Sequence, residues 1–88
     1  MLTINEVNAY AIDNEIDLVV FSNPSFDDSI LGISSDDRVI YDYDKMVEEL
    51  MKKDNISELD AIEFIDYNTL RSLSYVENSP IILQIKNY

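Results

Sequence analysis

The sequence predicts a single α+β domain, with a four-stranded, mostly antiparallel sheet and helices packed on one face. Apolar residues make up 47% of the 88 residues, and one glycine and two prolines leave no linker between domains. A chain of this length buries roughly 60–70% of the surface that its unfolded form exposes. We therefore expect residues 1–88 to form one domain in the order helix, strand, strand, strand, helix, helix, strand.

The first helix is predicted from a capping box at the N-terminus. Thr3 is the expected N-cap, and Glu6 stands three residues later, where its side chain can accept a bond from the Thr3 amide. Ile4, Val7 and Ala11 follow at helical spacing. The helix should end near residues 13–14, because asparagine tolerates the left-handed conformation that follows many helices.

Four runs of β-branched and aromatic residues predict the strands. They are residues 16–21, 29–34, 38–42 and 80–86. A tight hairpin at residues 35–37 should join the second and third strands. Pro80 would occupy the first position of the last strand, where a missing amide does the least harm.

Two further helices are predicted between the third and fourth strands. The first should span residues 43–53, with Met46, Val47, Leu50 and Met51 forming its apolar stripe. The second opens with another capping box, Ser57 to Asp60. The side chains expected to face inward on this last helix are Ala61, Ile62, Phe64 and Ile65. The pattern leaves two ends open for it, a turn near Asn68 or a continuation through residue 73.

The composition argues against catalysis. The chain has no cysteine and no histidine, which removes thiolate chemistry and the usual general base. A single glycine excludes the glycine-rich phosphate and dinucleotide motifs. Asp42 and Asp44 begin the spacing of a calcium loop, but Met46 and Val47 stand where further ligands belong. We expect no enzyme activity, no cofactor and no dedicated metal site.

The net charge of −12 is the most informative single property of the chain. Small soluble domains usually carry a net charge of magnitude about 2–8. Such a surface repels nucleic acids and anionic membranes and attracts cationic partners. The N-terminus lacks a secretory signal, and no apolar run approaches the roughly 20 residues that span a bilayer. We expect a soluble cytoplasmic protein that binds neither nucleic acid nor membrane directly.

The spacing of the acids suggests a partner-binding face. Asp60, Glu63 and Asp66 recur every third residue, where helical side chains lie about 5–6 Å apart. Phosphates along a nucleic-acid strand are separated by roughly 6–7 Å. Four more acids could extend the array: Asp42, Asp44, Glu48 and Glu49. The hypothesis is a DNA-mimic inhibitor that docks on the basic, nucleic-acid-binding surface of a partner protein; an ordinary solvated helix face is the competing interpretation.

Tyrosines support a binding role and also an alternative. Tyr43 and Tyr67 lie beside the acids, and tyrosine is enriched at interface hot spots. They are the expected aromatic anchors of the partner-binding face. In the alternative, the protein is a homodimeric accessory or scaffold protein, its acids serve only solubility, and tyrosine pairs with exposed strand edges form the dimer interface.

Three segments, residues 23–27, 42–46 and 63–69, carry a resemblance to a group of small uncharacterised acidic proteins of bacteria and their mobile elements. The likeness extends from about Asn14 to Ile82. It implies no activity and no catalytic residue, but it suggests a phage or mobile-element accessory inhibitor, similar to anti-CRISPR proteins. The hairpin departs from the group, because Asp36-Asp37 replaces the Asp-Gly that similar chains tend to have.

Overall fold

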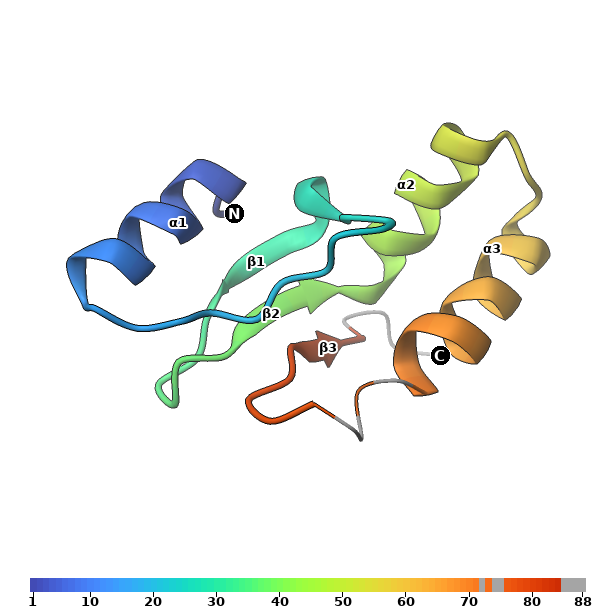
Figure 1. Cartoon of the computed structure of the whole chain (residues 1–88). Coiled ribbons are helices and arrows are strands. Elements are labelled where there is room, and N and C mark those ends of the chain that lie inside the picture. Colours follow the sequence, from blue (N-terminus) through green and yellow to red (C-terminus); the bar gives the residue numbers. More distant parts are fainter. Residues whose placement is uncertain (72, 74–75, 85–88) are drawn as a thin grey trace.

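A computed structural model describes residues 1–71, 73 and 76–84. Figure 1 shows a small α+β domain whose sheet lies between the first helix on one side and the next two helices on the other. The elements are α1 (Ile4–Asp13), the 3-10 turn η1 (Asp27–Ser29), β1 (Ile30–Ile33), β2 (Val39–Asp42), α2 (Tyr43–Asp54), α3 (Glu58–Phe64), the π-helix η2 (Ile65–Leu70) and β3 (Ile81–Leu83). The domain measures 39 × 27 × 25 Å along its principal axes.

The described sheet has three strands in the order β1-β2-β3 and is mixed. β1 pairs antiparallel with β2, with a register shift between Ile30 and Gly32. β3 pairs in parallel with β2, from Ile40 opposite Ile81 to Asp42 opposite Leu83. The predictions of four strands and of a mostly antiparallel sheet are therefore wrong. The last strand is shorter than expected, and residues 85–86 of that prediction lie outside the described residues.

The predicted strand that the described sheet lacks is the one at residues 16–21. They run as an extended segment without strand pairing among the described residues. Leu18, Val20 and Phe21 nevertheless pack against the core. The Phe21 amide donates to the Tyr41 hydroxyl at 3.1 Å. β-branched and aromatic residues favour a half-buried extended surface, and this segment satisfies that preference by packing its side chains.

The hairpin between β1 and β2 is confirmed. The Asp37 amide donates to the Ser34 carbonyl at 3.0 Å, and the Ser34 amide donates to the Arg38 carbonyl at 2.8 Å. Asp37 has φ of 59°, so the three-residue loop ends in the left-handed conformation typical of such hairpins. Glycine adopts that conformation most readily, and Asp is one of the few other residues that tolerate it.

Capping chemistry fixes the helix starts as the sequence predicts. The Glu6 amide donates to Thr3 Oγ1 at 3.1 Å, and the Thr3 amide donates to Glu6 Oε1 at 3.0 Å. The Asp60 amide donates to Ser57 Oγ at 3.1 Å, which forms one half of the second predicted box. The last helical region continues past Asn68 as η2, and the expected helix at residues 43–53 is α2.

The core lies between the sheet, α2 and the α3–η2 segment, and Val7 of α1 also belongs to it. Its buried apolar residues are Val7, Phe26, Ile30, Val39, Tyr41, Tyr43, Met46, Val47, Leu50, Ala61 and Ile65. Figure 1 places α2 and α3 together, whereas α1 lies apart from them near β1. Within the described residues, no helix combines the length and apolar character needed to cross a bilayer.

Candidate functional site

An acidic groove with two aromatic rings lies on the α3–η2 segment. It has a volume of about 610 Å³ and is lined by Asp60, Glu63, Phe64, Asp66, Tyr67 and Asn68. We call these six residues the α3–η2 groove. Four of them are residues that the sequence predicts as partner contacts, namely Asp60, Glu63, Asp66 and Tyr67. The structure therefore brings these four together on one face of a continuous helical segment.

The two aromatic rings of the groove are open to solvent. Tyr67 is 69% exposed and Phe64 is 37% exposed. The sequence predicts that Phe64 faces inward, and this prediction is wrong. The buried positions on this segment are Ala61, Ile65 and Thr69, four residues apart, so the inward stripe passes beside Phe64 at the end of α3.

Contacts within the chain position two groove side chains. The Tyr43 hydroxyl donates to Asp66 Oδ1 at 2.9 Å, which ties the carboxylate to a residue that is only 8% exposed. The Arg71 guanidinium lies over the Tyr67 ring, 4.8 Å from its centroid. A cation within about 6 Å of an aromatic centroid is attracted to the ring face. Asp66 and Tyr67 are therefore each positioned by a contact within the chain.

The acids predicted around α2 have mixed surroundings. Asp42 is the N-cap of α2, accepts from the Lys45 amide at 3.3 Å and is 7% exposed. Asp44 is half-buried, and Glu48 is exposed. Glu48 and Glu49 share a shallow hollow with Lys45 and Lys52, so lysines partly offset their charge. Asp42 and Tyr43 thus have internal roles and little surface to offer, while the carboxylates of the α3–η2 groove are exposed.

Glu49 turns toward η1 and is half-buried. The Ser29 hydroxyl donates to its Oε1 at 2.8 Å. Burial raises the pKa of the Glu49 carboxyl, and the charges of Asp28 and Asp27 raise it further; hydrogen bonds from the Ser29 side chain and the Asp28 backbone act the other way. A pKa raised by folding means that ionised Glu49 destabilises the native state.

Replacing Glu49 with glutamine is therefore expected to raise the melting temperature at neutral pH. The glutamine carbonyl can still accept from Ser29, while the buried charge is removed. Protonated Glu49 contributes to the stability of the native state. This contribution is fully present below the unfolded pKa near 4.5, and it is lost as pH rises through the higher folded pKa. The gain should therefore shrink toward pH 4. Thermal melting of Glu49→Gln and of the exposed control Glu48→Gln across this range checks it, and an equal response of both variants would contradict it.

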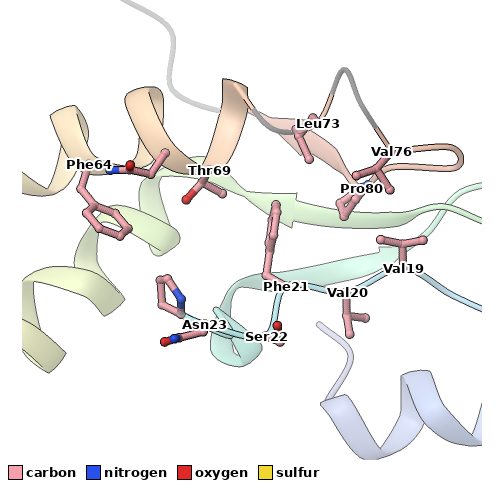
Figure 2. A pocket seen from close by; sticks show the side chains of 12 residues that line it. Val19, Val20, Phe21, Ser22, Asn23, Phe64, Thr69, Leu73, Val76 and Pro80 are labelled. Carbon is pink, nitrogen blue, oxygen red and sulfur yellow. The ribbon is translucent and has the colours of Figure 1, made fainter.

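A second cavity lies on the other side of Phe64. It has a volume of about 240 Å³ and includes Ser22, Asn23, Phe64, Thr69 and Val76 in its lining. Figure 2 shows Phe64 and Thr69 reaching toward it from the helical segment, opposite Ser22 and Asn23, which follow the extended segment. Its described lining contains hydroxyl, amide and apolar groups and no ionisable side chain.

The structure gives one further observation on metal binding, and comparisons with known proteins give another on relatedness. Among residues 1–71, 73 and 76–84, no three carboxylates gather closely enough to hold a metal ion. Comparisons of the chain with protein-family models, curated proteins and solved structures found no match. The surface itself, and above all the α3–η2 groove, is therefore the feature of the molecule that bears on function.

Proposed function

We propose that the protein is a non-enzymatic acidic binding protein that docks on a basic, nucleic-acid-binding surface of a partner protein. In this proposal it acts as a phage or mobile-element accessory inhibitor, of the anti-CRISPR-like, DNA-mimic type. The observation that carries the proposal is the α3–η2 groove, in which three carboxylates and two exposed rings share one helical face.

Electrostatics support a cationic partner. The formal net charge is −12, and Asp60, Glu63 and Asp66 are exposed and close together in the fold. A surface of one sign raises the rate of encounter with the opposite sign and repels anions such as nucleic acid. Side chains three residues apart on a helix lie about 5–6 Å from each other, near the phosphate spacing of roughly 6–7 Å. A partner that binds phosphates could therefore accept these carboxylates instead.

The double variant Glu63→Gln/Asp66→Asn is expected to weaken partner binding at least about tenfold, while the fold remains intact. Two charges are lost from the groove, and loss of one member of a charged interface pair commonly costs about 2–5 kcal/mol when it is buried on binding. The side-chain carbonyl that replaces the Asp66 carboxylate could still accept from the Tyr43 hydroxyl, so the internal contact is kept. The control Asp13→Asn/Glu15→Gln removes the same charge from exposed positions at the end of α1.

The measurement is affinity capture from bacterial lysate at low and high salt, followed by binding assays on the purified partner. The captured partner should bind nucleic acid, lose that binding when the acidic protein is added, and release the protein at high salt. Retention of nothing basic at low ionic strength would rule the proposal out. Equal losses in the groove variant and the α1 control would show that net charge alone matters.

The second candidate is a homodimeric accessory or scaffold protein. β1 and β3 are the outer strands of the described sheet, and Leu83 on β3 is 44% exposed. An outer strand presents backbone groups that can pair with a second copy. Sedimentation at several concentrations separates the candidates, because a tight dimer that is insensitive to salt favours this one, and a monomer favours the acidic inhibitor.

A further inference from the structure

We propose that the α3–η2 groove recognises an arginine side chain of the partner, with the guanidinium stacked on the exposed rings and paired with the carboxylates. This inference rests on the proposed function, which supplies a basic partner, and it goes further by naming the group that is recognised. The guanidinium would lie against Tyr67 and Phe64, and its N–H groups would donate to Asp66 and Glu63.

The chain itself already contains a guanidinium that lies over the Tyr67 ring. The Arg71 guanidinium already lies 4.8 Å from the centre of the Tyr67 ring, so the ring accepts a guanidinium at contact distance. Tyr67 remains 69% exposed in spite of that contact, and much of its surface is available to a second group. Tyrosine combines a large apolar ring with a polar tip, and it is frequent at the centre of interfaces for that reason.

The carboxylates of the groove supply acceptors for the N–H groups of the guanidinium. Asp66 is fixed by the bond from the Tyr43 hydroxyl to its Oδ1 at 2.9 Å. An ionised carboxylate has about four acceptor sites on its two oxygens, so one internal bond leaves capacity for a partner. Glu63 and Asp60 are exposed on the same groove. A carboxylate held in place loses less entropy on binding than a free one, which favours affinity.

The exposed rings and the carboxylates together favour arginine over lysine. Guanidinium is planar and weakly hydrated, stacks on aromatic faces and donates a fork of N–H groups to carboxylates. The lysine ammonium is a compact, strongly hydrated charge that gains less from a ring. All six lining residues belong to the α3–η2 segment, so a partner arginine would lie along this open face.

The test is titration with two peptides of equal length and charge, one rich in arginine and one rich in lysine. Calorimetry gives the affinities, and amide and aromatic NMR shifts of the protein give the site. The wild type should bind the arginine peptide about two- to fivefold more tightly, since a cation–π contact at an exposed site is worth roughly that factor. The largest shifts should lie at Phe64, Asp66 and Tyr67.

The variant Tyr67→Ala should remove this preference while retaining the charge-driven affinity that both peptides share. Tyr10→Ala, which deletes a 38% exposed tyrosine on α1, is the matched control and should keep the preference. If Tyr67→Ala does not fold, the NMR map of the wild type decides alone. Equal binding of both peptides, or shifts away from the groove, would overturn this inference and leave the proposed function standing. Binding of neither peptide at low salt would overturn both.

Discussion

Replacing Ile65 with alanine is expected to lower the free energy of unfolding by about 2–5 kcal/mol. Ile65 is 0% exposed and begins η2, directly after the last residue of α3. Its side chain belongs to the same core cluster as Leu50 of α2 and Tyr41 of β2. Alanine would leave a cavity where the α3–η2 segment packs on the rest of the molecule, and packed interiors relax only partly around such a loss.

Leu59→Ala is the matched control for this prediction. Leu59 lies on α3 and is 65% exposed, so its loss should change stability by no more than about 0.5 kcal/mol. Ile65→Val should give an intermediate loss of about 0.5–1.5 kcal/mol. Urea unfolding followed by circular dichroism measures all three variants. If Ile65→Ala unfolds at the same urea concentration as the wild type, the assignment of the helix face is wrong.

Local chemistry explains the parts of the fold that the sequence predicts well. The Thr3 and Glu6 side chains reach backbone groups only three residues away, so the start of α1 depends on nothing distant. The apolar stripe of α2 also holds, with Met46, Val47 and Leu50 buried. The hairpin follows from the turn residues between two short apolar runs. Each of these features is decided within a few residues of sequence.

Non-local pairing explains the errors. Residues 16–21 have strand-like composition, but composition reports burial of an extended segment and does not report which backbone groups pair. The parallel partner of β2 comes from residues 81–83, about forty positions along the chain, and no short-range pattern encodes that choice. Phe26 is 1% exposed although the residues around it are typical of a surface turn. Its ring lies 5.8 Å from the Phe21 ring and belongs to the same core cluster as Leu50 and Ile65, which come from distant parts of the chain.

The sequence likewise predicts only some of the residues of the candidate site. Periodicity of Asp60, Glu63 and Asp66 indicates one face, and these three do line one groove. The Asp42 cap of α2 is a local signal, because aspartate is a preferred N-cap residue, and the prediction of Asp42 as a partner contact overlooks it. The bond from Tyr43 to Asp66 joins residues 23 positions apart and depends on packing. Two groove residues, Phe64 and Asn68, are missing from the sequence-based prediction. Asn68 lies in the π-helical turn, which a search at the α-helical period of 3.6 residues cannot detect.

Replacing Tyr41 with phenylalanine is expected to lower the free energy of unfolding by about 1–3 kcal/mol at neutral pH. Tyr41 is 0% exposed, and its hydroxyl accepts from the Phe21 amide at 3.1 Å. Phenylalanine keeps the ring, which packs 4.7 Å from the Phe21 ring, but leaves the amide without its acceptor. Since this bond ties the extended segment to β2, the amide of Phe21 should also exchange faster with solvent. Chemical denaturation and hydrogen exchange measure the two effects, and an unchanged stability would show that water replaces the hydroxyl.

The buried Tyr41 hydroxyl should also make the free energy of unfolding depend on pH in the alkaline range. Burial raises the pKa of Tyr41 to about 12; the charges of Asp27 and Glu49 add to the rise, while the bond from Phe21 opposes it. Because the folded pKa lies above the unfolded value of 10.0, the stabilising effect of protonated Tyr41 is complete below pH 10 and is lost as pH rises toward 12. Wild-type stability should fall in this window by an extra amount of up to about 1.4 kcal/mol per pH unit, a component that Tyr41→Phe lacks. The difference in stability between the two proteins should therefore narrow above pH 10, and a constant difference through pH 11 would contradict the burial of this hydroxyl.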